Sequence, residues 1–302
     1  MVNIQITDSC SLNCSYCISQ KTSKNQNMDL EDFCNLLEYL SPSKVNLGIT
    51  GGEPTEHPEF EDFLAQINYY NDTTGTHTTI FTNGINLKPY LPYISNNDLI
   101  VLNCSVDNQQ QKEILDLLPR VNRKVAYKCN LQNNITDYSS FWNIVKEYRL
   151  QEIQLSLMLP IDQYIFDKEK YYIKIKPIFL QFCKDSIKNK CKINLVCNHI
   201  PYCYFTLEER EIVNEACGAG LKDLKICQPD IIIDPDWNAR MCWGCKEQVN
   251  LSSFDRIEEV ERYLQYKSIY PRTIANNTGK CTICKQGDFF QCQGGCLYFA
   301  DI

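Results

Sequence analysis

Short segments rich in β-branched residues alternate with amphipathic segments through the first half of this 302-residue chain. Residues 2–7 and 45–49 have the pattern of strands, and residues 28–40 between them place apolar side chains at helical spacing. The alternation goes on, with strands predicted at residues 78–82, 98–106, 124–131 and 153–159 and helices at residues 58–70, 109–118 and 141–148. About six such units fit into roughly the first 200 residues, which predicts an α/β fold with a parallel sheet.

Three cysteines follow the first predicted strand, in the stretch CSLNCSYC that runs from Cys10 to Cys17. Three thiolates leave a four-coordinate metal ion, or one iron of an iron–sulfur cube, with an open position. The chain has 18 cysteines but only three histidines, so thiolate-rich iron–sulfur or zinc sites are favoured over imidazole sites. The cysteine spacing therefore indicates a reactive metal centre.

Two further loops fall at predicted strand ends, where parallel sheets bind their ligands. Gly51-Gly52-Glu53-Pro54 follows the second strand, and Thr82-Asn83-Gly84 follows the third. A glycine pair lets the backbone approach a ligand closely, and the Glu53 carboxylate can accept hydrogen bonds from an ammonium group. Tyr16 lies inside the cysteine stretch, where its ring would either stack on a purine or pack against the protein.

Composition excludes several classes of protein. The net charge of −7 and the pI of about 5.2 argue against binding to nucleic acid. No apolar run approaches the roughly 18 residues of a membrane span, which predicts no membrane partner. The start MVNIQITDSC lacks the pattern of a signal peptide, so we expect a cytoplasmic location with reduced cysteines.

With these motifs in this order, the chain resembles the radical S-adenosylmethionine (radical SAM) enzymes. The resemblance covers roughly residues 1–160 and rests on the cysteine triplet, on ITGGEPTEHPEF, and on FTNG and CSVD further along the chain. It implies a partial (β/α)6 radical SAM barrel over residues 1–205.

The resemblance also implies the roles of single residues. Cys10, Cys14 and Cys17 would hold a 4Fe–4S cluster whose fourth iron binds S-adenosyl-L-methionine (SAM). Glu53 and the Gly51–Gly52 backbone would fix the methionine amino group of SAM, and Asn83 would also lie at the cofactor. Ser105 or Asp107 would reach the ribose or the carboxylate, although an ordinary polar pair at a strand end is the alternative. No catalytic side chain can be named.

The last third of the chain, residues 206–302, resembles the small, cysteine-rich SPASM/Twitch extension of radical SAM enzymes. The resemblance implies a first auxiliary 4Fe–4S cluster held by Cys217, Cys227, Cys242 and Cys296. A second would be held by Cys281, Cys284 and Cys292, with Cys245, another side chain or no protein group as fourth ligand. A Twitch arrangement with one auxiliary cluster and a structural zinc site are the alternatives. Core positions are expected for Cys34, Cys104, Cys129, Cys183, Cys191, Cys197 and Cys203.

The implied function is reductive cleavage of SAM to a 5′-deoxyadenosyl radical that abstracts a substrate hydrogen. Radical SAM proteins with such extensions frequently modify ribosomally made peptides by thioether or C–C crosslinks or by epimerisation. The alternatives are a small-molecule radical dehydrogenase or rearrangement enzyme, and a non-catalytic iron–sulfur or zinc protein. Implied partners are a peptide substrate and an external one-electron reductant of the flavodoxin or ferredoxin type. Since the core begins near residue 3, recognition of a peptide leader would fall to a separate leader-binding protein or to the enzyme's own groove.

Overall fold

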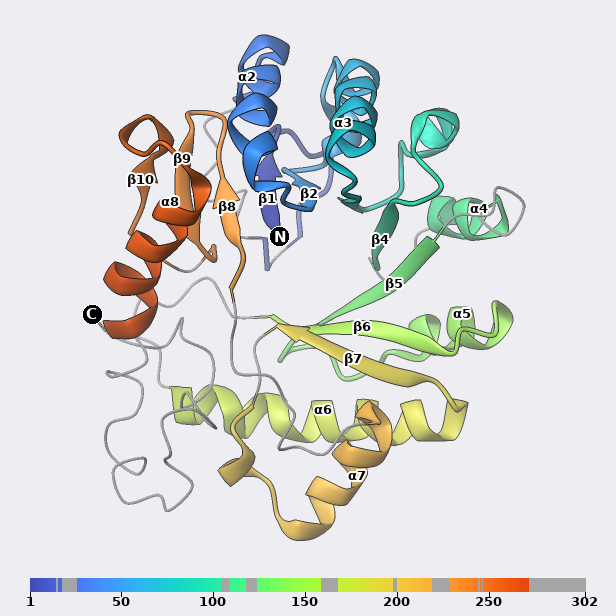
Figure 1. Cartoon of the computed structure of the whole chain (residues 1–302). Coiled ribbons are helices and arrows are strands. Elements are labelled where there is room, and N and C mark those ends of the chain that lie inside the picture. Colours follow the sequence, from blue (N-terminus) through green and yellow to red (C-terminus); the bar gives the residue numbers. More distant parts are fainter. Residues whose placement is uncertain are drawn as a thin grey trace. The chain divides into compact units, whose positions relative to one another are not determined.

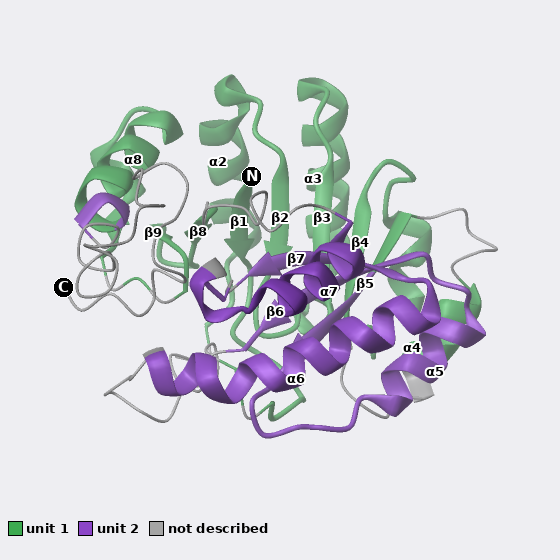
Figure 2. Cartoon of the chain, turned by 90° about the horizontal axis from the view of Figure 1, so that it is seen from below, with its two compact units in different colours: residues 1–103, 109–126, 229–268 green, residues 104–108, 127–228, 269–302 purple. Residues whose placement is uncertain are grey.

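The computed structural model describes most of the chain and divides it into two compact units (Figure 2). The described residues are 1–14, 16–17, 26–104, 109–117, 124–158, 168–197, 200–218, 229–243, 245 and 247–271. The first unit comprises residues 1–103, 109–126 and 229–268, and the second comprises residues 104–108, 127–228 and 269–302.

The sheet of the first unit has the strand order β10-β9-β8-β1-β2-β3-β4 (Figure 1). Its strands are β1 (Val2–Gln5), β2 (Leu47–Thr50), β3 (Thr78–Thr82), β4 (Leu99–Cys104), β8 (Ile231–Ile233), β9 (Asn238–Met241) and β10 (Val249–Asn250). Strands β8, β1, β2, β3 and β4 pair in parallel, and β9 and β10 are antiparallel to their neighbours. Val2 is in register with Leu47 of β2 on one side and with Ile231 of β8 on the other. The carboxyl ends of β1, β2 and β3 therefore lie next to one another.

Helices α2 (Leu30–Leu40) and α3 (Phe60–Thr74) connect these parallel strands. Buried side chains of α2 recur at helical spacing, and the ring of Phe33 lies 4.4 Å from that of Phe63 on α3. The unit also contains α4 (Gln109–Leu117), α8 (Ile257–Leu264) with its π-helical continuation η8 (Gln265–Ile269), and the short helices η1 (Ser41–Ser43), η2 (Pro54–Glu56), η3 (Lys88–Tyr93) and η7 (Leu251–Ser253).

The second unit is built on β5 (Lys124–Leu131), β6 (Glu152–Leu157) and β7 (Lys192–Cys197), which pair in parallel. Its helices are α5 (Ser139–Glu147), α6 (Lys168–Asn189), α7 (Leu207–Cys217) and the short η5 (Tyr202–Tyr204). Tyr127 on β5 stacks on Phe141 of α5 at 5.1 Å, and Phe182 of α6 packs 5.6 Å from Phe141. Helices α6 and α7 lie on the same side of β6 and β7 (Figure 1).

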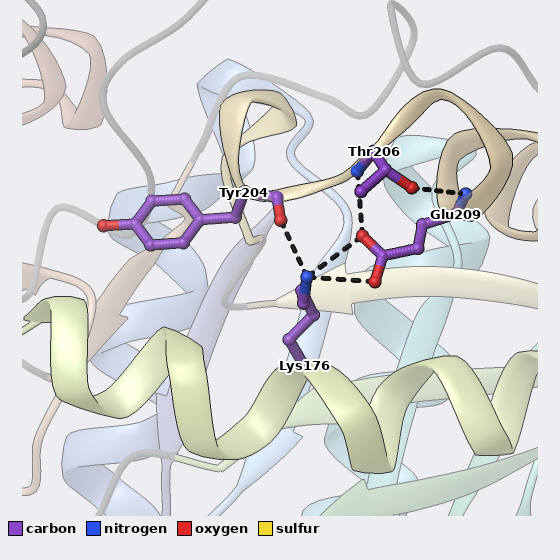
Figure 3. Close-up of polar contacts among 4 residues, drawn as sticks. All are labelled: Lys176, Tyr204, Thr206 and Glu209. Carbon is purple, nitrogen blue, oxygen red and sulfur yellow. Dashed lines mark hydrogen bonds and ion pairs between the residues drawn. The ribbon is translucent and has the colours of Figure 1, made fainter.

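A polar clamp fixes α7 against α6 (Figure 3). The Lys176 ammonium lies 3.0 Å from both carboxylate oxygens of Glu209 and 3.1 Å from the Tyr204 carbonyl oxygen. Glu209 also closes a capping box with Thr206, the residue before the first turn of α7. Desolvation raises the pKa of the Glu209 carboxyl, but the hydrogen bond from the Thr206 N–H and the hydrogen bond and charge of Lys176 together outweigh it and lower the pKa.

The predicted α/β class with a mostly parallel sheet is confirmed. Two of the residues expected in the core are not there, because Cys197 and Cys203 are exposed, whereas Cys129, Cys183 and Cys191 are buried and Cys34 is half-buried. The side chain of Cys104 lies outside the described part of the chain. The predicted domain boundary between residues 205 and 206 stays a prediction. No helix in the described ranges combines the length and apolar character that crossing a bilayer requires.

Candidate active site at the carboxyl ends of β1, β2 and β3

The loop that carries the three cysteines is closed at its base by the segment that follows it. The Asp8 N–H donates to the Gln26 carbonyl and the Met28 N–H donates to the Ile6 carbonyl, each at 2.9 Å. The Thr7 hydroxyl adds a 2.6 Å hydrogen bond to Asn27 Oδ1. These bonds fix both ends of the loop directly beyond β1, so the cysteines are held at that end of the sheet.

Cys10, Cys14 and Cys17 are all half-buried free thiols. The Cys17 N–H donates to the Cys14 carbonyl at 2.9 Å, which folds the Cys-x2-Cys part into a turn. Burial, together with the nearby negative charges of Glu56, Glu53 and Cys14, raises the pKa of the Cys10 thiol to about 11, although a hydrogen bond with the Leu12 backbone opposes the rise. Cysteines bind metals as thiolates, so loading this loop releases protons.

The side chains that recur at metal-ligand spacing in this loop are the thiols of Cys10, Cys14 and Cys17. Soft thiolate ligands suit an iron–sulfur cluster or zinc. Within the described ranges, no three cysteine, histidine or acidic side chains stand in a ready metal-binding arrangement. The donor set therefore fits a cluster by its chemistry, and the coordination itself stays a prediction.

Gly51 and Gly52 lie against the backbone of the strand-one loop. A Cβ atom on Gly51 would meet the Thr7 carbonyl oxygen at 2.6 Å, and one on Gly52 would meet the Ser9 carbonyl oxygen at 2.2 Å. The close approach makes two hydrogen bonds of 2.7 Å, from the Gly52 N–H to the Thr7 carbonyl and from the Glu53 N–H to the Ser9 carbonyl. Only glycine allows these two loops to dock in this way.

Glu53 is a buried carboxylate, 2% exposed, that ties the loop after β2 to the loop after β3. Its Oε1 accepts from the Thr55 N–H at 3.2 Å, the Thr55 hydroxyl at 2.7 Å and the Thr82 hydroxyl at 2.6 Å. Its Oε2 accepts from the Asn83 N–H at 2.6 Å. Burial raises the pKa of the Glu53 carboxyl, and the hydrogen bonds from Asn83, Thr82 and Thr55 oppose that rise. A carboxylate oxygen has about two acceptor positions, so Oε2 can take one more donor, such as an ammonium group.

Glu56 and His57 fasten the same turn to its surroundings. Glu56 Oε1 accepts from the Ser11 N–H at 2.9 Å and from the Ser11 hydroxyl at 2.7 Å, next to Cys10. His57 is 2% exposed; its Nδ1 accepts from the Glu59 N–H, so its Nε2 is the protonated nitrogen and donates to the Met28 carbonyl at 3.0 Å. Burial lowers the pKa of His57, which keeps the ring neutral.

Asn83 and Gln111 form a polar pair that the sequence did not reveal. Gln111 on α4 is fully buried, and its amide donates to the Asn83 carbonyl at 2.8 Å and to the Asn103 carbonyl at 2.6 Å. Asn83 is 8% exposed, and its Oδ1 accepts from the Ile85 N–H at 2.8 Å. Helix α4 begins with three glutamines, and nothing in the sequence marks Gln111 as the one that makes this contact.

The other predicted site residues lie elsewhere or outside the described residues. Tyr16 is half-buried beside Cys14, whose thiol it contacts by a side-chain hydrogen bond. Cys242 and Cys245 share a turn closed by a 3.2 Å bond from the Cys245 N–H to the Cys242 carbonyl. Cys217 at the end of α7 receives a hydrogen bond from the Cys183 thiol, which lowers the pKa of Cys217. The predictions that lie outside the described residues are Ser105, Asp107, Cys227, Cys281, Cys284, Cys292 and Cys296.

Comparison with known proteins relates the segment that carries these loops to a protein family. The model of the Radical SAM superfamily matches residues 4–133. GTP 3',8-cyclase of Helicobacter pylori is 28% identical over 137 residues, which is 43% of this chain and 40% of that protein. Molybdenum cofactor biosynthesis protein 1 of Bos taurus is 32% identical over 112 residues, which is 35% of this chain and 17% of that protein. The chain thus spans less than half the length of these curated relatives.

The solved structure of Streptococcus suis SuiB bound to S-adenosylmethionine has the same fold, with a TM-score of 0.67 and 15% identity over 98% of this chain and 72% of that chain. A second SuiB structure matches with a TM-score of 0.59 and 12% identity over 89% of this chain and 67% of that chain. Proteins of the radical SAM superfamily use a 4Fe–4S cluster and SAM. The matched segment holds the cysteine loop, the Gly51–Glu53 turn and the Asn83 loop, and residues 4–133 of this chain are thus identified as a radical SAM domain.

Proposed function

We propose that this protein cleaves SAM reductively and uses the resulting 5′-deoxyadenosyl radical to abstract hydrogen from a peptide substrate. The observation that carries the proposal is the docking of the three-cysteine loop onto the Gly51–Glu53 turn, through two 2.7 Å hydrogen bonds. This contact holds the only closely spaced thiol triplet of residues 4–133 beside a buried carboxylate.

Each residue of the site would have its own role in binding the cluster or SAM. Cys10, Cys14 and Cys17 would hold the cluster, which when bound supplies the electron for SAM cleavage. Glu56 fixes the loop through Ser11, next to the first of these ligands. The free acceptor position of Glu53 Oε2 is suited to the methionine ammonium of SAM, because a charged donor compensates a buried carboxylate.

A peptide substrate is supported by the extent of the two kinds of similarity. GTP 3',8-cyclase of Helicobacter pylori aligns with only 43% of this chain, so that similarity carries no substrate to the remaining residues. The match to the SuiB structure extends over 98% of this chain. The SPASM/Twitch resemblance of the last third of the sequence favours peptide modification and an external flavodoxin- or ferredoxin-type reductant.

A small-molecule substrate is the second candidate, because a curated relative of this chain is named GTP 3',8-cyclase and GTP is a small molecule. Neighbouring genes separate the two: a short gene for a cysteine- or aromatic-rich peptide supports the first candidate, and sugar or nucleotide genes support the second.

The test is formation of 5′-deoxyadenosine by the anaerobically reconstituted protein with dithionite and SAM. Wild type should form it, and Cys10→Ala, Cys14→Ala and Cys17→Ala should each form none. Cys34→Ala is the matched control, since Cys34 is a half-buried thiol on α2 outside the loop. Cleavage retained in the three loop variants, or absent from a fully loaded wild type, contradicts the proposal.

Iron content tests the last third of the chain. A triple variant with Ala at Cys10, Cys14 and Cys17 should keep about eight irons with two auxiliary clusters, or about four with one. Zinc in their place would make the last cysteines a structural site and remove the predicted auxiliary clusters.

A further inference from the structure

The loop after β3 is fastened to helix α4 by one buried side chain. The Gln111 amide nitrogen donates to the Asn83 carbonyl oxygen at 2.8 Å and to the Asn103 carbonyl oxygen at 2.6 Å. Asn83 directly follows β3, and Asn103 is the next-to-last residue of β4. All three residues belong to the first unit, so Gln111 joins the carboxyl ends of two neighbouring strands within that unit.

The backbone of Asn83 is held from both sides. Its N–H donates to Glu53 Oε2 at 2.6 Å, and its carbonyl oxygen accepts from Gln111. Two rotatable backbone bonds of Asn83 connect these two peptide groups. Releasing the carbonyl therefore also frees the N–H and the side chain of Asn83 to turn. Through this one residue, Gln111 acts on the position of the Glu53 carboxylate.

The turn around Asn83 packs directly on α4. Gly84 has φ 80°, and a Cβ atom on it would meet Ile114 at 3.4 Å and Gln111 at 3.7 Å. The Gly84 N–H donates to the Thr82 hydroxyl at 2.9 Å, and this hydroxyl in turn donates to Glu53. The hydrogen bonds that hold Glu53 thus come from a loop whose own support is α4.

The Asn83 side chain supplies the observation that indicates a ligand. Its Oδ1 accepts from the Ile85 N–H at 2.8 Å, whereas its buried Nδ2 has no hydrogen-bond partner in the described part of the chain. The residue is 8% exposed. Buried polar groups in native proteins are normally paired, so an unused amide beside Glu53 indicates that a group from outside the chain binds there.

The two spare groups are complementary to an α-amino acid. Glu53 Oε2 can accept from an ammonium group, and Asn83 Nδ2 can donate to a carboxylate. They belong to two residues that are joined by the 2.6 Å hydrogen bond from the Asn83 N–H. The methionine part of SAM carries an ammonium and a carboxylate on the same carbon atom.

We propose that Gln111 is a positioning residue of the SAM site. It holds the Asn83 carbonyl, and thereby keeps the Asn83 N–H on Glu53 and the Asn83 amide available to the methionine carboxylate of SAM. Gln111 is fully buried, and its Oε1 has no partner among the described residues. An unpaired buried oxygen costs stability, so packing alone would favour an apolar side chain here. The inference rests on the proposed function and names what holds that site in place.

Gln111→Met tests the proposal in the anaerobically reconstituted holoprotein. Methionine has a similar length but no donor, so it removes both hydrogen bonds with little change in volume. The Kd of SAM in equilibrium dialysis and the KM for SAM in 5′-deoxyadenosine formation should each rise about 10-fold or more. The rate at saturating SAM should stay within about twofold of wild type, with unchanged iron content. A loss of folded protein alone would lower the maximal rate and leave KM unchanged.

Gln111→Glu adds a readout that a purely structural role would not affect. A protonated glutamic acid can donate one hydrogen bond to these carbonyl oxygens, whereas the ionised carboxylate can donate none and repels them. The SAM affinity of Gln111→Glu, relative to that of Gln111→Met, should therefore improve as the pH falls from about 8.5 to about 6. This pH dependence decides the outcome if Gln111→Met fails to fold.

Asn71→Leu is the matched control. Asn71 is a buried amide on α3, and its Nδ2 donates to the Thr78 hydroxyl at 3.0 Å and to Asp98 Oδ1 at 3.2 Å. Thr78 begins β3, so this variant also loses two buried hydrogen bonds, at the end of the strand away from the site. It should be less stable in urea and bind SAM as wild type does.

Three results would overturn the proposal. The first is a Gln111→Met protein that binds SAM as tightly as wild type. The second is an Asn71→Leu protein whose SAM affinity falls as far as that of Gln111→Met. The third is a Gln111→Glu protein whose SAM affinity follows the same pH dependence as that of Gln111→Met.

The same samples separate this inference from the proposed function. A wild type that binds SAM in a Gln111-dependent manner but forms no 5′-deoxyadenosine refutes the activity and supports the positioning role. A wild type that forms 5′-deoxyadenosine, with a KM for SAM that Gln111→Met leaves unchanged, supports the activity and refutes the positioning role.

Discussion

Replacing Gly52 by alanine adds one methyl group at the contact between the cysteine loop and the turn after β2. That methyl carbon would lie 2.2 Å from the Ser9 carbonyl oxygen and 2.5 Å from the Asp8 carbonyl oxygen, and both obstacles are backbone. Restoring ordinary contact requires the Ser9 carbonyl to retreat by roughly 1 Å. The retreat stretches the 2.7 Å bond from the Glu53 N–H to the same carbonyl beyond hydrogen-bonding distance.

The energetic cost follows from these two effects. Overpacking costs about 1–3 kcal/mol, and the loss of one or two hydrogen bonds costs about 0.5–1.5 kcal/mol each. We expect Gly52→Ala to lower the free energy of unfolding by about 1.5–6 kcal/mol. Because Ser9 precedes Cys10, we also expect the variant to retain less iron after reconstitution.

Urea denaturation and iron analysis measure the two consequences side by side. Gly75→Ala is the control: Gly75 ends α3 at φ 73° with no atom within 4 Å of where the added methyl group would lie, so it reports backbone strain alone, about 1 kcal/mol. Gly75→Ala should load iron normally. A Gly52→Ala protein as stable as Gly75→Ala, with full iron content, would refute the reasoning.

Three further predictions concern the contacts around the site and the second unit. Glu56→Ala removes both hydrogen bonds to Ser11, so metal-free protein should lose about 1 kcal/mol of stability and alkylate faster at the neighbouring thiol; unchanged iodoacetamide kinetics would argue against the tether. The pKa of His57 is lowered from 6.5 by burial, so its contribution to stability is complete above pH 6.5 and declines as the pH falls below that value; His57→Gln should flatten this part of the pH profile of urea unfolding, and an unchanged profile contradicts the assignment. Thr206→Ala breaks the capping box with Glu209 and should lower stability by about 1 kcal/mol, seen as faster hydrogen exchange in α7, with 5′-deoxyadenosine formation unaffected; equal exchange in both proteins would show that the box contributes nothing.

Local sequence patterns predicted several elements closely. The strands at residues 78–82 and 124–131 have the predicted bounds, and the helix predicted at residues 28–40 begins two residues later at Leu30. Helix α6 has no such signal, because Pro177 stands inside it and its apolar residues do not form a single stripe. Tertiary packing of Phe179 and Phe182 overrides the local preference there.

The site was predictable where spacing carries chemistry and hidden where it depends on tertiary contact. The sequence placed the cysteine triplet and Glu53 in loops at neighbouring strand ends, and the structure has these loops in contact, while metal binding by the triplet stays a prediction. The hydrogen bonds from Thr82 and Asn83 to the Glu53 carboxylate could not be predicted from the sequence, since they depend on how two loops pack together. Cys197 was expected in the core because a bulge that changes strand alternation leaves no mark in the sequence.

The pairing of β1 with β8 has a consequence for how the chain is made. Val2 and Ile231 are neighbours in the sheet, although most of the chain separates them in sequence. Until residues 231–233 emerge from the ribosome, β1 presents an unpaired edge of backbone N–H and C=O groups directly beside the cysteine loop. Such an edge recruits foreign strands, and closing a loop of this length is slow. We therefore expect this edge to be open to mispairing during synthesis, and we expect the cysteine loop to take up iron after β8 has paired rather than when the cysteines appear.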